Sequence, residues 1–390
     1  MSTLKVDNIR HNSATSDAIT TAADGTCSAK LTSIGGGGLP HRNKARNGAM
    51  KISQRGTTFS PTTSTVHLMD GWRTDHGSSG NLDTTVTQST DAPAGFTKSL
   101  KITPDSTLTP SGSQNGLLAH YLEGQDLQDL AFGTSDAKPV TVSWYAKTSA
   151  TGAGNYTVKV DYRDASNNTY SVNKLFAFTT TWTRYTYTIP ATGTATSNGI
   201  RDTNTLGLKV EYHLFAGPDD VHSQFTQWTI NPSPTFKVIS GQKNFMDNTS
   251  NELYITGFQV EVGNTATSFE HRSFGEELSR CQRYYVKYAG PRRYPFINGA
   301  GANTQGFLNF QYPVKMRAAP TVTFGAGVGI FTPQVSVSQT VTSAAAIGVD
   351  GFTTIKWVGQ SNLGSHGDAK YGMILHDSTA NSVIETSAEL

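Results

Sequence analysis

Two arginines and a tyrosine stand together in the segment Tyr288–Phe296, which reads YAGPRRYPF. Such a group can clamp an acidic sugar or a phosphate, because guanidinium forks form paired hydrogen bonds with those anions. Arg292, Arg293 and Tyr294 are therefore candidate ligand-binding residues. The same residues also suit a joint between two domains, in which the arginines pair with neighbouring carboxylates. The residue types leave both interpretations open.

Three further candidates lie nearer the C-terminus. Trp357 precedes a polar stretch, and an exposed tryptophan can stack on a sugar ring whereas a buried one packs between sheets. His366 and Tyr371 bound the polar loop HGDAKY, where a solvated histidine is the simpler interpretation of His366. Trp144, in contrast, sits in the middle of a strand-like run and is expected in the core.

Catalytic signatures are scarce. The sequence has no nucleophile elbow, no H-E-x-x-H zinc motif and no P-loop. Carboxylates occur in pairs, but glycoside hydrolysis needs two that face each other across a substrate, which proximity in sequence does not show. An oxygen-rich turn at residues 161–168 could hold a hard cation, although a hairpin loop bonded to its own backbone is favoured. We expect no enzyme, no metal and no cofactor.

Composition narrows the fold class. The 390 residues carry 31 Lys and Arg against 29 Asp and Glu, and this balance gives no support for nucleic-acid binding. Charged residues make up 15% of the chain, below the usual value of about 25%. Low charge with abundant Gly, Thr and aromatic residues predicts many short strands joined by tight turns. No apolar run approaches the length of a membrane span, and no secretory signal is visible, so we expect no membrane insertion.

The first 38 residues form no compact unit. Leu4, Val6 and Ile9 are their early apolar residues, and the glycines Gly35–Gly38 follow. We expect an extended arm and a Gly-rich hinge over residues 1–38. Because so short an arm cannot bury its own apolar side chains, it is expected to dock on another chain or on copies of itself.

The rest of the chain reads as β structure with one helix. Alternating apolar and polar residues predict strands at residues 141–146, 155–163, 170–178, 181–190, 206–215 and 253–262. We therefore predict an all-β chain, with a jelly-roll β-sandwich at 39–272 and a smaller C-terminal β domain at 291–390. Between them, Ser273 and Glu276 form a capping box that predicts a linking helix at 273–290, ended by Gly290-Pro291.

Several segments resemble a widespread group of bacteriophage virion proteins, many from cyanophages and other marine phages, that are described as tail-fibre-like. The N-terminal MSTLKVDNI with AADGT at 22–26 is similar to their N-terminal segment, and NGAM at 47–50 with QRGT at 54–57 is similar to the start of their globular part. WYAK at 144–147 and WTR at 182–184 resemble strands of a carbohydrate-binding-module-like jelly roll. FQVEVG at 258–263, ATSFEHR at 266–272 and CQRYY at 281–285 are the most specific similarities.

The resemblance implies a homotrimeric tail fibre in the virion, made in the host cytoplasm and attached to other tail proteins through the arm that holds Leu4, Val6 and Ile9. Its distal β domains would bind a host surface glycan, for which lipopolysaccharide is the expected class. The glycan-binding candidates are Arg292, Arg293, Tyr294, Trp357, His366 and Tyr371. Two alternatives stay open: a decoration, head-fibre or adaptor protein without receptor binding, and, less favoured, a polysaccharide depolymerase.

Overall fold

The structure is a computed structural model. It describes residues 6–10, 12, 17–21, 23, 27–29, 33–34, 37–38, 41–61, 64–77, 82–192, 199–232, 237–289, 293–298, 306–325, 328–332, 335–340, 344–347, 352–357, 371–376 and 383–390. Strands β3 to β5, β22, β23 and β25 to β29 are described by their backbone. The part of the chain that the structure describes holds no helix with the length and hydropathy of a membrane span.

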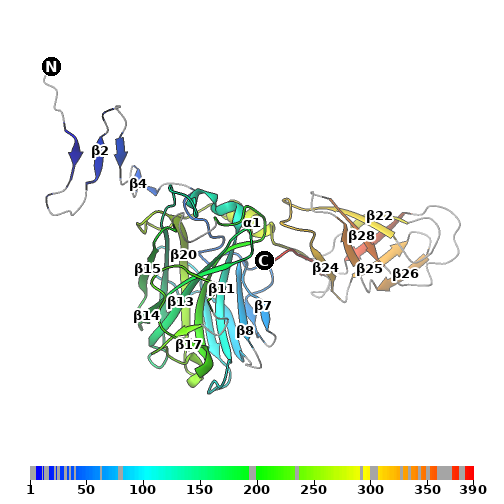
Figure 1. The fold of residues 1–390 in the computed structure, drawn as a ribbon. Coiled ribbons are helices and arrows are strands. Elements are labelled where there is room, and N and C mark those ends of the chain that lie inside the picture. The colour runs from blue at the N-terminus through cyan, green and yellow to red at the C-terminus, as the bar shows by residue number, and fades with distance from the viewer. Residues whose placement is uncertain are drawn as a thin grey trace.

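Two antiparallel sheets face each other and form a jelly-roll sandwich, so the prediction of an all-β chain is confirmed (Figure 1). Sheet I consists, in spatial order, of β15 (Thr183–Ile189), β12 (Val140–Thr148), β20 (Leu253–Val262), β10 (Ser99–Pro104), β9 (Thr84–Ser89) and β6 (Thr58–Phe59). Sheet II consists of β18 (Thr229–Ile230), β14 (Thr169–Phe178), β13 (Gly154–Arg163), β16 (Leu206–Ala216), β11 (Asn115–Glu123), β8 (Trp72–Gly77) and β7 (Thr65–His67).

The alternation of apolar and polar residues determines which side chains enter the core. Each long strand turns every second residue inward, as an antiparallel sheet with one buried face requires. The indole of Trp144 on β12 is fully buried, and its ring centroid lies 5.3 Å from that of Tyr212 on β16. On the other side of the core, Trp72 of β8 meets Phe258 of β20 at 5.1 Å. The predicted core position of Trp144 is confirmed.

The helix begins where its capping box predicts but ends earlier. Helix α1 (Phe274–Gln282) starts after Ser273, whose hydroxyl accepts a hydrogen bond from the backbone N–H of Glu276 at 3.2 Å. The expected continuation to Gly290 is wrong, because Tyr285–Ala289 forms strand β21. Tyr285–Ala289 pairs with β30 (Val383–Ser387), a partner about a hundred residues away that local sequence does not reveal.

Among its described residues, the C-terminal part contains two sheets. A three-stranded sheet has the order β21, β30 and β24 (Thr321–Phe324). A seven-stranded sheet, on the right in Figure 1, consists of β26 (Val335–Thr340), β25 (Val328–Thr332), β29 (Tyr371–His376), β22 (Arg293–Asn298), β23 (Gly306–Gln311), β28 (Phe352–Trp357) and β27 (Ala344–Ile347). The prediction that this part of the chain is β structure is confirmed.

Short elements complete the chain. Near the N-terminus lie β1 (Asn8–Ile9), β2 (Ile19–Thr21), β3 (Cys27–Ala29), β4 (Ser33–Ile34) and β5 (Gly37–Gly38), which Figure 1 shows outside the sandwich. The sandwich also carries η1 (Gly124–Leu130), η2 (Pro218–Asp220), β17 (Val221–His222), β19 (Val238–Ile239) and η3 (Phe245–Asp247).

Candidate functional site

The outer face of sheet II, opposite the core, carries an unusual set of charged side chains. We call it the charged face; its residues are Arg73, Asp75, Tyr121, Lys159, Asp161, Lys209, Glu211 and His213. Strand register places them in rows across the sheet. One row runs from Tyr121 through Lys209 to Asp161, and the next contains Glu211 and Lys159. Strands 4.7–4.9 Å apart thus bring together side chains that are distant in sequence.

Four of these residues form a compact ion network. The ammonium of Lys159 lies 3.0 Å from the carboxylate of Asp161 and 3.9 Å from that of Glu211. Lys209 pairs with the same two carboxylates, at 3.2 Å for Asp161 and at closer range for Glu211. The side chains of Asp161 and Glu211 are 2% and 5% exposed, so the network is shielded from water although it lies outside the core. Burying charges in this way is unfavourable unless each has a partner.

The lysines determine the ionisation of the two acids. Burial alone raises the pKa of Asp161, but Lys159 and Lys209 outweigh it and hold that pKa below its ordinary value. Burial likewise opposes ionisation of Glu211, and the same lysines bring its pKa well below the ordinary range. A general acid in glycoside hydrolysis needs a raised pKa. This carboxylate pair is therefore not suited to acid–base catalysis.

We predict that acid destabilises the fold in two stages. Burial lowers the pKa of His213, so its imidazole stays neutral in the folded state while the unfolded chain takes up a proton below about pH 6.5. The contribution of neutral His213 to the free energy of unfolding is complete above about pH 6.5. It is lost as the pH falls from there towards the lowered pKa of the folded state. The lowered pKa values of Asp161 and Glu211 add a second loss below about pH 4.5, where the unfolded carboxylates protonate. Urea midpoints measured from pH 8 to pH 3 should show both stages, and a flat profile between pH 7 and 5 would contradict the first.

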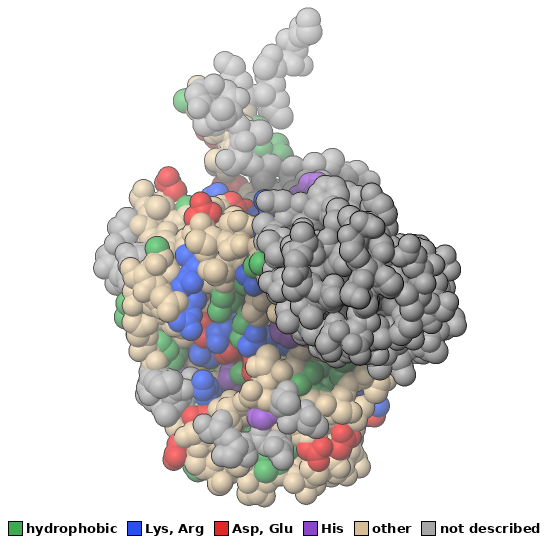
Figure 2. Space-filling model, turned by 90° about the vertical axis from the view of Figure 1, so that its right-hand side faces the viewer, with side chains coloured by type: hydrophobic (Ala, Val, Ile, Leu, Met, Phe, Trp, Pro, Cys, Tyr) green, Lys and Arg blue, Asp and Glu red, His purple; other side chains and the backbone are tan. Residues whose placement is uncertain are grey.

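One end of the charged face is partly accessible. Arg73 donates from Nε to Asp75 at 2.8 Å, and its guanidinium carbon lies 4.1 Å from the ring centroid of Tyr121. The Tyr121 hydroxyl donates to Asp75 at 3.2 Å, and the ring itself is half-buried. Figure 2 shows a side of the sandwich on which Lys and Arg side chains gather in a band with acidic and histidine side chains. This end offers donors, acceptors and one aromatic ring to a polar ligand.

Two other parts of the chain border the charged face. Beside β14, the backbone N–H of Phe225 donates to Asn173 at 2.7 Å, and Gln242 donates to the carbonyl of His213 at 3.0 Å. Beside β8, the guanidinium of Arg73 donates to the carbonyl of Leu390 at 2.7 Å. The charged face thus lies between a segment that follows β16 and the residues that follow β30, and the accessible end is on the side of the latter.

The oxygen-rich turn is bonded to its own backbone. Asp164 accepts hydrogen bonds from the backbone N–H and the side-chain amide of Asn168, both at 2.8 Å. Asp161 belongs to the charged face and contributes nothing to the turn. Among the described residues, no three His, Cys, Asp or Glu side chains are grouped as metal ligands.

The ligand-binding candidates predicted from the sequence fall on the C-terminal sheet or outside the description. Arg293 and Tyr294 lie on β22, where they pair with β29, and Tyr371 is on β29 opposite Ile297. Trp357 ends β28, which β23 separates from β22. Arg292 and His366 lie outside the described residues. Their binding roles stay predictions.

The arm residues predicted to attach to a partner are exposed where they are described. Val6 is 44% exposed and Ile9 52% exposed, the latter on strand β1. Leu4 lies outside the described residues. Exposure of two apolar side chains agrees with an arm that does not bury them itself.

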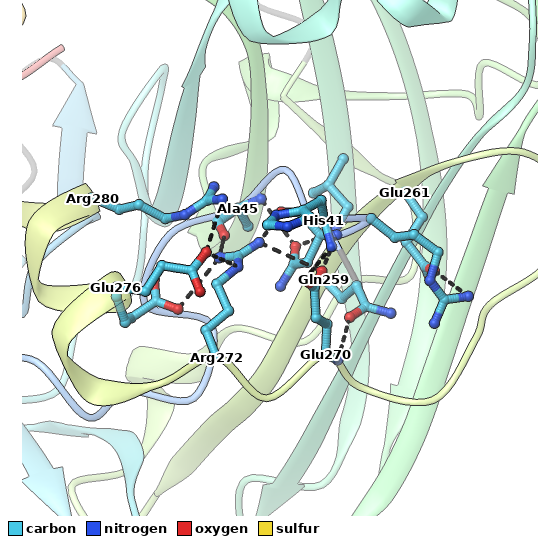
Figure 3. A network of polar contacts seen from close by, with 12 residues as sticks. His41, Ala45, Gln259, Glu261, Glu270, Arg272, Glu276 and Arg280 are labelled. Carbon is cyan, nitrogen blue, oxygen red and sulfur yellow. Dashed lines mark hydrogen bonds and ion pairs between the residues drawn. The ribbon is translucent and has the colours of Figure 1, made fainter. Parts of the chain in front are cut away.

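A polar network ties the start of the sandwich to the segment after β20 (Figure 3). The carboxylate of Glu270 accepts hydrogen bonds from the backbone N–H groups of His41 and Asn43, at 2.5 and 2.7 Å. The guanidinium of Arg272 donates to the carbonyl of Ala45 at 2.8 Å. Beside it lies a polar recess of about 430 Å³, lined by His41, Asn43, Lys44, Gln125, Asp126, Gln128, Asp129 and Arg280. We regard the network as the anchor of the chain leading from the arm.

Sequence reasoning missed the charged face, although part of its signal is visible. Lys159 and Asp161 alternate with apolar residues in the run 155–163, and Lys209 and Glu211 do the same in 206–215. Charges at every second position of two neighbouring strands indicate a common outer face. Local sequence does not reveal that these two strands pair, so their shared face could not be predicted.

The comparisons with known proteins identify no family for this chain. Neither a protein-family model nor a curated protein matches the sequence. The enzymatically active domain of tailspike protein 4 from bacteriophage CBA120 is similar in structure at 11% identity and a TM-score of 0.31, over 60% of this chain. The chain spans only 23% of the length of that domain.

A CBM22-1 xylan-binding domain from Paenibacillus barcinonensis is similar over 54% of this chain and 94% of its own, at 14% identity and a TM-score of 0.26. A family 11 carbohydrate-binding module of a cellulase from Clostridium thermocellum is similar over 55% and 96%, at 8% identity and a TM-score of 0.26.

Proposed function

We propose that the chain binds a glycan, without cleaving it, on the accessible end of the charged face. The observation that carries this proposal is the array of Arg73, Asp75, Tyr121 and Lys209, fixed by strand register on a rigid sheet. A sugar ring presents hydroxyl groups around its edge and C–H groups on its faces. Charged donors and acceptors form strong hydrogen bonds with hydroxyl groups, and an aromatic ring packs against the C–H face.

In the organism, we propose a homotrimeric tail fibre of a phage virion that recognises a host surface glycan, with lipopolysaccharide as the expected class. The exposed Val6 and Ile9 support attachment through the arm. The strand-rich sandwich supports a rigid body. Three copies would multiply a weak affinity for each site into firm attachment. Labelling the chain on intact particles tests this: capsid labelling instead of tail labelling would favour the decoration protein.

Replacing Tyr121 with alanine is expected to weaken glycan binding about fivefold, because one aromatic contact contributes about 1 kcal/mol. Titration calorimetry with host lipopolysaccharide measures the affinity. The matched control is Trp182→Ala on the outside of sheet I, where the half-buried indole donates to Asp91 at 3.0 Å. Equal losses in both variants, or no binding by the unmodified protein, would count against the assignment to sheet II.

A further inference from the structure

Two arginines extend the charged face beyond the ion network. The backbone N–H of Arg201 donates to the carbonyl of Arg163 at 3.1 Å, next to an antiparallel bridge between Asp164 and Ile200. This register places Arg163 and Arg201 directly opposite each other. Because Arg163 follows Asp161 by two residues on β13, both arginines lie on the outer side of sheet II.

The two guanidinium groups have hydrogen bonds but no carboxylate partner. Arg163 donates to the backbone carbonyl of Asn167 at 3.1 Å, and Arg201 donates to the side-chain oxygen of Asn167 at 2.7 Å. Within the described part of the chain, neither arginine forms an ion pair, although Asp164 and Asp202 are their neighbours in sequence. The Nε of Arg201 is shielded from solvent and has no hydrogen-bond partner there.

This arrangement is unfavourable in the free protein. Like charges directly opposite each other on two strands destabilise the pairing. Burial, and then the charge of Arg163, lower the pKa of Arg201, while Asp164 opposes the shift only in part. Lys159 and Lys209 each have carboxylate partners, whereas among the described residues this arginine pair has none and adds positive charge to the face.

We propose that Arg163 and Arg201 bind the anionic group of a glycan that occupies the charged face, so that the ligand is an acidic polysaccharide. This inference rests on the proposed function. Two adjacent guanidinium forks match the oxygens of a carboxylate, a sulfate or a phosphate. An anion between them replaces their mutual repulsion with two attractions.

The first experiment compares three polymers on the full chain by titration calorimetry at low and high salt. The probes are polygalacturonate, which carries carboxylates, dextran sulfate, and neutral dextran. We expect at least one anionic polymer to bind about tenfold or more tightly than dextran, with the difference shrinking at high salt. Tighter binding of polygalacturonate would identify a carboxylated glycan, and tighter binding of dextran sulfate a sulfated one. Binding of dextran as tight as that of both anionic polymers would overturn the inference and leave the proposed function intact, whereas binding of no polymer would overturn both.

The second experiment removes the arginine pair. The double variant Arg163→Gln, Arg201→Gln is expected to lose the preference for the anionic polymer and its dependence on salt. The control, Lys51→Gln with Lys138→Gln, removes the same charge at two exposed positions outside sheet II and should keep both. A third variant, Arg201→Lys, retains the charge without the fork and should lose part of the preference, which separates paired hydrogen bonding from net charge. An unchanged preference in a folded double variant would refute the assignment.

Discussion

Replacing Glu211 with alanine is expected to lower the free energy of unfolding by about 3–5 kcal/mol, the usual effect of removing one partner from a buried ion pair. Glu211 contacts Lys159, Lys209 and His213 at the centre of the charged face. Without it, two lysines that are almost shielded from water share the single carboxylate of Asp161. Urea unfolding at pH 7 measures the change.

The matched control is Glu252→Ala on the opposite sheet. The carboxylate of Glu252 pairs with Lys101, but it is 33% exposed. Exposed ion pairs contribute at most about 1 kcal/mol. If Glu211→Ala lowers the free energy of unfolding no more than Glu252→Ala does, water enters the network freely.

A double variant then tests why a charged network is there at all. The double variant Lys209→Met, Glu211→Met removes one lysine and one carboxylate and leaves Lys159 paired with Asp161 at 3.0 Å. Replacing a complete buried ion pair with apolar residues is often neutral or stabilising. We therefore expect most of the stability to return while glycan binding is lost, which would assign the network to ligand binding and not to folding.

The sequence predicted those features that local patterns determine. The alternation in 155–163 and 170–178 predicted the strands that become β13 and β14, and the placement of Trp144 in the core followed from its position in a strand-like run. The features it did not predict depend on contacts between distant segments. Asp161 and Lys209 meet only because β13 pairs with β16, across 48 residues.

The end of α1 shows the same limit. Residues 284–288 contain three tyrosines and a valine that fit either the last turn of a helix or a strand. Propensity is a weak guide where a tertiary partner is available. Here β30 supplies that partner, so these residues become β21.

The contact between β30 and the sandwich leads to the second large effect. Glu389→Ala is expected to lower the free energy of unfolding by about 3–5 kcal/mol and to release the residues around it. The Glu389 carboxylate lies 3.4 Å from Arg46 and 3.1 Å from Arg55, and its side chain is 6% exposed. Burial opposes its ionisation, but both arginines hold its pKa below the ordinary value. The two arginines, stacked over Tyr284 and Tyr285, would lose their shared acid.

Hydrogen exchange at β21 and β30, together with thermal unfolding, measures this release. The control is Glu385→Ala, on β30 itself, where the carboxylate is 34% exposed and pairs with Lys287 at 3.4 Å. Only the change at position 389 should accelerate exchange throughout both strands. Equal acceleration in the two variants would contradict the role assigned to the buried carboxylate.

The same variant also tests whether the C-terminal residues support the binding face. Arg46 donates to the backbone carbonyl of Tyr121 at 2.8 Å, and Arg73 donates to the carbonyl of Leu390 at 2.7 Å. Glu389 therefore holds Arg46, which contacts the backbone of Tyr121. The next residue, Leu390, contacts Arg73 at the accessible end. Because both contacts position side chains that the proposed ligand would meet, Glu389→Ala should weaken glycan binding without altering any residue of the charged face. Unchanged affinity in a variant with accelerated exchange at β30 would show that the face is positioned by sheet II alone.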